Sequence, residues 1–341
     1  MVQDKELSTP KERRNLQNLL WIGKLVVTVL ILSYIYKTFR NEQKGIGDVG
    51  AVFQNILVSD HVPFLFFMLI LVPVNWALES LKWQQLAKKV VDITFRDAFR
   101  GTLTGLAFGV AAPAQLGDTI GRVAALKSDR RLEAIGAAIV SNGIQFYISV
   151  AAGAVGWLHL QDKIGLSSQS KQFVNLLLAF VTLSGIVVVW FRKPLMDWHP
   201  KRKIFQKIHA YLRIIGSYSA LDLGLSTLYG SLRYAVFLSQ FVLALSLFDF
   251  PVPALELASA VSLIFLAKTL IPAINVLGDL GLREFTALLV FEQYNLPAEE
   301  IIAATFLVWI LNVLGPILIG IFLIWKYKWS KMKFSSSKIN S

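Results

Sequence analysis

Apolar stretches of about 20 residues constrain the fold of this chain more than any other feature. Of its 341 residues, 55% are hydrophobic and only 16% are charged. A helix needs about 20 consecutive apolar residues to cross the hydrocarbon core of a bilayer, and a soluble domain of average composition does not contain repeated runs of this kind. The runs that are long enough are 16–38, 62–80, 133–159, 173–191, 226–247 and 300–326. The sequence therefore predicts an all-α polytopic membrane protein with six full spans.

Two further apolar stretches, 101–126 and 254–294, are interrupted by polar residues in a related pattern. Residues 113–122 read PAQLGDTIGR, and residues 272–284 read PAINVLGDLGLRE. In both copies a proline comes first, and an arginine follows the Gly-Asp pair by four residues. A repeated interruption of this kind predicts two broken helical segments with related roles.

The basic residues indicate how the spans are oriented. Most of the 34 lysines and arginines lie in the N-terminal tail, between 82 and 100, between 127 and 131, between 192 and 213, and after 325. Lysine and arginine are enriched in cytoplasmic loops, so these segments are expected on one face. We therefore predict a plasma membrane protein with both termini in the cytoplasm.

The same rule predicts that the two broken segments enter from opposite sides. The first has basic residues on both flanks and is expected to be a re-entrant hairpin from the cytoplasm. The second lies between Asp249 and Glu299 and is expected to dip in from outside. Irregular backbone inside a membrane is tolerated when it is buried in protein or lines a wet cavity. Eight full spans remain an alternative, although they would place Lys127, Arg130 and Arg131 outside.

This order of elements predicts two repeats of inverted topology, a common design in transporters. Each repeat contains two spans, a re-entrant helical hairpin and a third span. The predicted parts are a cytoplasmic tail at 1–15, a first repeat at 16–160 with hairpin 101–126, a second repeat at 161–328 with hairpin 254–294, and a cytoplasmic tail at 329–341.

The repeated motif combines residues that break a helix with residues that start one. Proline lacks a backbone N–H, and glycine permits a tight reversal. The structural positions of the two copies are Pro113, Gly117, Pro272, Gly278 and Gly281. Asp118 and Asp279 are expected at the N-caps of short helices. Arg122 and Arg283, at i+4 from these aspartates, are expected on the same helical faces.

Two interpretations of these charges stay open. A helix N-terminus beside a guanidinium is suited to binding phosphate, so the two motifs could hold a phosphate-bearing headgroup. Alternatively, each aspartate caps its helix and pairs with its own arginine, which neutralises two charges that are costly inside a membrane. The other candidates for substrate binding are Gln115, Asn142, Arg233, Lys268, Glu284 and Asn312. Glu79, Lys82 and Trp83 are interpreted as interfacial anchors at the cytoplasmic end of the second span.

The sequence lacks the residues and motifs of several other function classes. It has no cysteine, and its four histidines have no spacing typical of a metal site. It contains no phosphate-binding loop, serine hydrolase motif, zinc protease motif or dinucleotide-binding motif. The basic residues flank apolar segments, which does not indicate nucleic-acid binding. We therefore expect no metal, no cofactor and no catalytic site.

Several segments resemble a known family, the lysylphosphatidylglycerol synthase transmembrane region, whose members are also described as flippase-like integral membrane proteins. The resemblance extends from about residue 15 to 328 and is carried by LKWQQL at 81–86, PAQLGDTIGRVAAL at 113–126, SLRYAVFLSQ at 231–240 and IPAINVLGDLGLREFTALL at 271–289. It implies a membrane domain that moves lipids between leaflets. Bifunctional relatives add a soluble domain that makes the aminoacylated lipid, and we expect this chain to be a stand-alone form without that domain.

The resemblance also implies which residues carry the function, and where this chain departs from its relatives. The implied residues are Pro113, Gly117, Asp118, Arg122, Pro272, Gly281, Arg283 and Glu284. Relatives often have a basic residue at the position of Gln115 and a glutamate at the position of Asp118, so the resemblance leaves the headgroup open.

The expected function is therefore translocation of a phospholipid or lipid-linked headgroup through a polar site at the membrane midplane. Arg122 and Arg283 would bind phosphate, while Lys268 and Glu284 would line the path. The expected partners are membrane lipids, either anionic or aminoacylated. An integral membrane enzyme acting on a lipid-linked substrate and a proton-coupled transporter of a small anion remain as alternatives.

Overall fold

The computed structural model describes residues 61–110, 116–126, 128, 134–197, 206, 214–270 and 282–326, together with isolated positions between 22 and 36. Within these residues every regular element is a helix. The predicted first span, 16–38, and the two predicted tails lie almost entirely outside the described residues.

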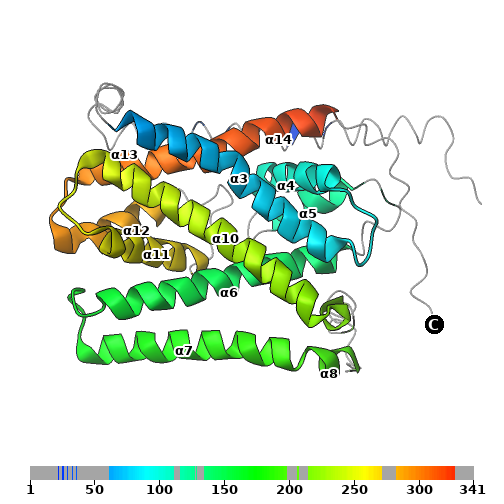
Figure 1. Cartoon of the computed structure of the whole chain (residues 1–341), viewed down its shortest axis with the longest axis horizontal. Coiled ribbons are helices and arrows are strands. Elements are labelled where there is room, and N and C mark those ends of the chain that lie inside the picture. The colour runs from blue at the N-terminus through cyan, green and yellow to red at the C-terminus, as the bar shows by residue number, and fades with distance from the viewer. Residues whose placement is uncertain are drawn as a thin grey trace, which may run out of the picture.

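Five helices are long and apolar enough to cross a membrane, and they coincide with the other five predicted spans. They are α3 (Val62–Ala87), α6 (Ala134–Leu160), α7 (Ser168–Trp190), α10 with the 3-10 turn η2 (Ala220–Phe248), and the continuous segment from α13 to α14 (Ala298–Lys326). Figure 1 shows them side by side along the long axis of the molecule. The apolar pattern of the sequence was therefore a reliable guide to these spans.

Local sequence signals explain where several of these helices begin. Proline occupies one of the first two positions of α3, where a missing N–H costs nothing. At the start of α10, the Ser219 side chain accepts a hydrogen bond from the backbone N–H of Asp222, whose carboxylate accepts one from the Ser219 N–H. This capping box satisfies two backbone groups that the helix leaves free.

The last long segment is interrupted near its middle by a π-helical turn. It consists of α13 (Ala298–Trp309), the π-helical η4 (Ile310–Leu314) and α14 (Gly315–Lys326). Pro316 has no N–H to donate to the carbonyl of Asn312, four residues before it. A π-helical turn is a common local adjustment where the regular ladder fails, and such turns are frequent at functional sites.

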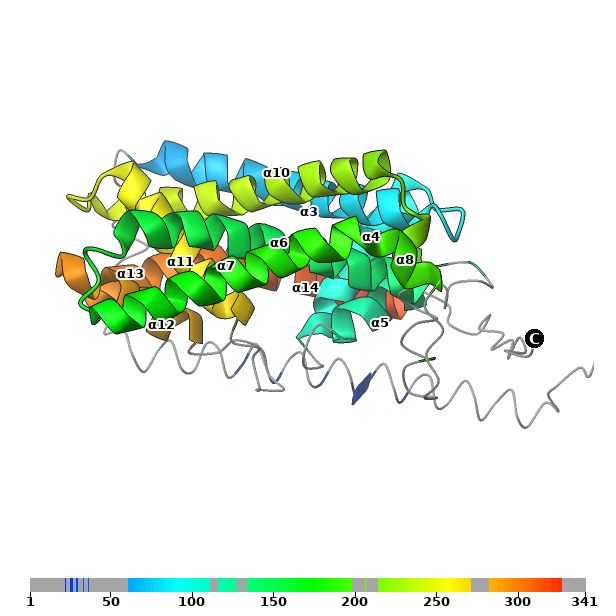
Figure 2. The ribbon, with the colours of Figure 1, turned by 90° about the horizontal axis from the view of Figure 1, so that it is seen from below.

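Two pairs of shorter helices occupy the predicted broken segments. The first pair is α4 (Phe95–Gly109) with α5 (Leu116–Ala124), and the second is α11 (Ala254–Leu270) with α12 (Leu282–Phe291), which the 3-10 turn η3 (Glu292–Tyr294) extends. With nine residues, α5 is only about 14 Å long, less than half of a 30 Å hydrocarbon core. The two pairs lie at opposite ends of the bundle (Figures 1 and 2).

The first pair is an antiparallel hairpin held by glycine contacts. Gly117 lies against the carbonyl group of Phe108, and a Cβ atom on Gly121 would lie 2.7 Å from the Cα of Gly105. Only glycine permits backbones to approach this closely. The sequence pattern had assigned Gly117 to the reversal itself, but it lies inside α5, where it allows the two helices to pack. Helix α4 ends at Gly109, and α5 begins at Leu116.

The two halves of the bundle pack on each other reciprocally. Helix α3 crosses α10 in antiparallel orientation, α11 packs on α6, and α4 packs on α14. Glycines lie at both of the latter contacts: Gly153 on α6 faces Leu266 of α11, and Gly320 on α14 faces Leu103 of α4. The first helix of each short pair therefore packs on the long helix that follows the other pair.

The outermost helix is α7, which packs on α6 and exposes an apolar surface. Phe173, Phe180 and Trp190 on this helix are more than 60% exposed. Its main polar tie to α6 is the hydrogen bond from Trp157 Nε1 to Asn175 Oδ1, at 2.7 Å. The shorter helix α8 (Arg192–Asp197) follows α7 directly. An exposed apolar face of this length is what a helix in contact with lipid requires.

Candidate functional site

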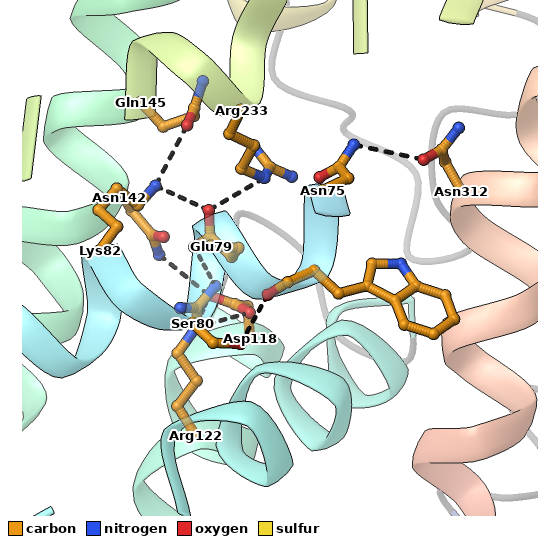
Figure 3. Close-up of polar contacts among 11 residues, drawn as sticks. Asn75, Glu79, Ser80, Lys82, Asp118, Arg122, Asn142, Gln145, Arg233 and Asn312 are labelled. Carbon is orange, nitrogen blue, oxygen red and sulfur yellow. Dashed lines mark hydrogen bonds and ion pairs between the residues drawn. The ribbon is translucent and has the colours of Figure 1, made fainter. Parts of the chain in front are cut away.

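Five charged side chains from three helices meet in the interior of the bundle (Figure 3). They are Glu79 and Lys82 on α3, Asp118 and Arg122 on α5, and Arg233 on α10, and we call them the charge cluster. Glu79, Lys82 and Arg122 are each no more than 3% exposed. Buried charges in a membrane protein are costly unless they are paired, and they usually mark function.

Glu79 is the centre of the charge cluster. One of its oxygens, Oε1, accepts a hydrogen bond from Arg122 Nη2 at 2.8 Å. The other, Oε2, lies 2.9 Å from Lys82 Nζ and 3.1 Å from Arg233 Nε. A single carboxylate therefore connects α3, α5 and α10 through three cations.

Asp118 and the amides of α6 complete the contacts. Arg122 Nε lies 2.9 Å from Asp118 Oδ1 and 2.8 Å from Oδ2. Asn142 Nδ2 donates to Asp118 Oδ2 at 3.4 Å, and Gln145 Oε1 accepts from Lys82 Nζ at 3.2 Å. Asn142 and Gln145 are three residues apart, so one face of α6 supplies both amides.

Two buried donors at the cluster have neither a hydrogen-bond partner nor an ionic contact among the described residues. They are Arg122 Nη1 and the indole Nε1 of Trp83. The guanidinium carbon of Arg122 lies 5.8 Å from the ring centre of Trp83, so the two side chains are neighbours. A guanidinium and an indole N–H can donate but cannot accept. The partner that these groups lack is therefore a hydrogen-bond acceptor.

The charges of the cluster do not balance. Lys82, Arg122 and Arg233 carry three positive charges, whereas Glu79 and Asp118 carry two negative ones. An excess cation in a dry environment attracts an anion strongly. The described part of the chain contains no group of three or more His, Asp or Glu residues placed to hold a metal ion. The arrangement is therefore suited to holding an anionic group.

An amide pair connects the face of α3 that carries Glu79 to the π-helical turn. Asn75 Nδ2 donates to Asn312 Oδ1 at 3.3 Å (Figure 3). Asn75 lies four residues before Glu79, so both side chains project from one face of α3. Asn312 belongs to η4, which places the irregular turn of the last long segment beside this face. Asn142, Arg233 and Asn312, three of the predicted candidates, are thus at or near the cluster.

The described residues of the second motif make a separate charge pair. Arg283 and Glu284 lie at the start of α12, are both 9% exposed, and pair with each other. Lys268 lies near the end of α11 and is exposed. The pair of Arg283 and Glu284 shares no residue with the charge cluster. Pro113, Gln115, Pro272, Gly278, Asp279 and Gly281, which were also predicted, lie outside the described residues.

One prediction about the first motif is wrong and another is confirmed. Asp118 is not the N-cap of α5, because the helix begins at Leu116 and Asp118 lies in its first turn. The predicted i, i+4 pair with Arg122 is present. A buried guanidinium makes a stronger charge-assisted hydrogen bond to a carboxylate than a backbone N–H does, which explains why the aspartate faces the arginine.

The interpretation of Glu79, Lys82 and Trp83 as interfacial anchors is also wrong. Lys82 is 1% exposed and Trp83 is completely buried, so neither faces the membrane interface. A sequence signal for their role did exist: Asn75, Glu79 and Lys82 follow one another at intervals of four and three residues, which forms a polar stripe on one face of an apolar helix.

A second polar network lies outside the long helices, at the end of the bundle that holds α11 and α12. Glu256 Oε2 lies 2.6 Å from Lys163 Nζ and accepts a hydrogen bond from Tyr294 at 2.8 Å. The hydrogen bond from Lys163 is the main cause that lowers the pKa of Glu256. Burial, followed by the hydrogen bond to Glu256, raises the pKa of Tyr294. These three residues tie both helices of the second pair to the α6–α7 loop.

At the opposite end, Tyr218 fastens the start of α10 to the end of α3. Its hydroxyl donates to the carbonyl oxygen of Leu86 at 3.0 Å. Burial is the main cause that raises the pKa of this tyrosine, so it keeps its proton and this hydrogen bond at physiological pH.

Comparison with known proteins agrees with the structure. The sequence pattern of one family, described as the lysylphosphatidylglycerol synthase TM region, matches residues 21–320. No curated protein sequence matches the chain. The matched range includes every residue of the charge cluster and both short helix pairs. Because it covers most of the chain, this multi-pass membrane protein belongs to the lysylphosphatidylglycerol synthase TM region family.

Proposed function

We propose that this protein moves a phosphate-bearing lipid headgroup from one leaflet of the membrane to the other. The observation that carries the proposal is the buried charge cluster, which holds one more cation than carboxylates. It also presents two donors without a partner among the described residues. A protein does not need an unbalanced charge in the interior of a membrane bundle for stability alone, because burying it is costly.

The reciprocal packing supports a fold of two repeats with inverted topology. Helices α3 and α10 correspond in the two repeats, and so do the pairs α4/α5 and α11/α12. In this arrangement α4/α5 enters the membrane from the cytoplasm and α11/α12 from outside. With the span predicted from the sequence at 16–38 as a sixth, both termini would lie in the cytoplasm of a cell whose plasma membrane holds the protein.

The position of the cluster along α3 suits a headgroup that enters from one leaflet. Glu79 lies eight residues before Ala87, which corresponds to about 12 Å of helix. The middle of α3 falls close to Asn75, which pairs with Asn312. The headgroup would therefore meet the charge cluster first and the amide pair next, near the midplane, while its acyl chains stay in the bilayer.

Within this site, Arg122 is the residue that contacts the phosphate. Its Nε and Nη2 atoms are held by Asp118 and Glu79, and Nη1 remains for an oxygen of the headgroup. Glu79 holds Lys82 and Arg233 close by, where they stabilise the negative charge. Arg283 and Glu284, on the second helix pair, form a second binding site for the headgroup, closer to the other leaflet.

A reconstitution experiment tests this function. The purified protein is placed in liposomes that contain a fluorescent lipid, and an impermeant quencher reports the fraction that reaches the outer leaflet. With the wild-type protein and with the exposed control Arg96→Ala, we expect the quencher to reach lipid that began in the inner leaflet. With Arg122→Ala, we expect the inner-leaflet lipid to stay protected from the quencher. If the wild-type protein leaves the inner-leaflet fluorescence protected for anionic, zwitterionic and aminoacylated lipids alike, the function is not lipid translocation.

The topology is tested separately with single cysteines, because the natural chain has none. Ser128→Cys lies beside the first helix pair, and Ser167→Cys lies in the loop before α7. In intact cells, an impermeant maleimide should label Ser167→Cys only. Labelling of Ser128→Cys from outside would contradict the inverted arrangement.

A further inference from the structure

We infer that the headgroup held by the charge cluster carries one net negative charge, as a phosphodiester without an amine does. The inference rests on the proposed function and names its substrate class. It distinguishes between the anionic and the aminoacylated lipids, which the sequence left equally open. Three observations about the described residues of the cluster support it.

The first observation is the charge excess. The three cations and two carboxylates leave one positive charge, and the contacts that join them are between 2.8 and 3.1 Å. A buried site is most stable when a ligand brings its total charge to zero. A phosphodiester anion does this. A zwitterionic headgroup leaves the excess in place, and an aminoacylated headgroup with two ammonium groups increases it.

The second observation concerns the carboxylate oxygens, which an ammonium group would need as acceptors. Each of the four oxygens of Glu79 and Asp118 lies within 2.9 Å of a nitrogen of Lys82 or Arg122. An ammonium group would have to share an oxygen that already faces a cation of the protein. The charge cluster therefore offers a headgroup amine no carboxylate oxygen that is free of a neighbouring positive charge.

The third observation concerns the donors. Arg122 Nη1 and Trp83 Nε1 are buried and lack a partner among the described residues, and Arg122 is only 3% exposed. Both groups require an acceptor. Two phosphodiester oxygens would satisfy both, whereas an ammonium group would satisfy neither.

The chemistry shared by possible ligands is a phosphate ester with a single negative charge, carried either by a lipid or by a soluble molecule. The experiment compares them directly. Liposomes contain phosphatidylglycerol, phosphatidylethanolamine or lysylphosphatidylglycerol, each labelled on an acyl chain so that the headgroup keeps its charge. A parallel set of liposomes measures uptake of radioactive glycerophosphoglycerol, a soluble phosphodiester with the headgroup of phosphatidylglycerol. We expect phosphatidylglycerol to cross at least about ten times faster than the other two lipids, because each of them leaves charge unbalanced. We expect no uptake of glycerophosphoglycerol.

Two variants test the charge excess itself. Lys82→Met and Arg233→Gln each remove one cation, from different helices, and leave Arg122 in place. We expect both to reduce the preference for phosphatidylglycerol over phosphatidylethanolamine by about tenfold, which corresponds to about 1.4 kcal/mol. Lys89→Met, on the partly exposed lysine that pairs with Asp222, is the matched control and should keep the preference. Unfolding temperatures in detergent show whether each variant is folded.

The outcomes separate this inference from the proposed function. Equal or faster movement of lysylphosphatidylglycerol would overturn the inference while lipid translocation stands. Uptake of glycerophosphoglycerol without lipid movement would overturn lipid translocation and support a ligand with one negative charge. If nothing moves, the shift in unfolding temperature with each short-chain lipid decides: stabilisation by phosphatidylglycerol alone supports the inference, and equal shifts with all three overturn it.

Discussion

The two short helix pairs carry the same Gly-Asp-x-x-x-Arg motif, yet among the described residues only the arginine of the first pair belongs to the charge cluster. In α5, Arg122 pairs with Asp118 within the motif and with Glu79 on another helix, so the pair is part of a network. In α12, Arg283 pairs with the adjacent Glu284. The motif therefore specifies a short helix with an inward guanidinium, while the surrounding helices decide what that guanidinium does.

The helix before each pair explains this difference. Before the first pair, α3 presents Asn75, Glu79 and Lys82 on one face. The long helix before the second pair, α10, carries Arg233, whose guanidinium contacts Glu79 of the charge cluster. The backbone packing of the two halves is reciprocal, but among the described residues the charge cluster is built on the first pair. A protein with this asymmetry can bind a headgroup more tightly at one binding site than at the other.

The most direct way to break the comparison is to remove each arginine in turn. Arg122→Ala should abolish lipid movement, by at least about 100-fold, because the phosphate contact is lost and Glu79 and Asp118 remain buried without it. Arg283→Ala should reduce the rate less, since Arg283 lies outside the charge cluster. Initial rates in liposomes measure both. Equal losses would mean that the two binding sites contribute equally, and normal transport by both variants would assign the motifs to structure alone.

A glycine pair on α4 sharpens the comparison by testing how closely the first hairpin must pack. A Cβ atom on Gly105 would lie 2.6 Å from Asp118 Oδ1 and 2.9 Å from Arg122 Cγ. Gly105→Ala should therefore displace both side chains and destabilise the protein by about 1–3 kcal/mol. On Gly109 the nearest atom would be 3.8 Å away, so Gly109→Ala is the control. Unfolding temperatures in detergent measure the difference, and equal temperatures for the two variants would show that the hairpin can relax.

The contact between the two halves can be tested by a double-mutant cycle of Glu79→Gln and Arg233→Gln. Their side chains are 3.1 Å apart and come from corresponding helices. Arg233 is partly exposed and Glu79 has two other cations, so we expect a coupling free energy of about 0.5–2 kcal/mol. Unfolding of the four proteins provides the cycle. Strict additivity would show that Arg233 does not stabilise Glu79.

The smallest expected effect is a dependence on pH at the second helix pair. The pKa of Glu256 is lowered from its ordinary value of 4.5, mainly by the hydrogen bond from Lys163. The stabilisation is therefore present above this ordinary value and is lost as the pH falls below it, when the carboxylate is protonated. Hydrogen exchange at the start of α11 should increase in acid, and Glu256→Gln should remove the change. An equal acid response in the variant would assign it to another group.

Features that depend only on residues close together in the chain could be predicted from the sequence. The five described spans follow from apolar runs, because a helix across a bilayer has no alternative way to satisfy its backbone. The positions of both broken segments follow from their proline and glycine residues, and the pair between Asp118 and Arg122 follows from the spacing of one helical turn. The polar stripe on α3 was also visible, but the tryptophan and the nearby lysines favoured an interpretation as a membrane interface.

The sequence by itself determined that this chain is a bundle of membrane helices with two interrupted segments, since length, hydropathy and helical spacing are local properties. Only the tertiary structure decided that Glu79, Arg122 and Arg233 meet. These residues are separated by 43 and 111 positions in the chain, and no local pattern specifies which helices pack together or in which register. The same packing decided which copy of the motif belongs to the charge cluster, and it left one positive charge and two donors for a ligand.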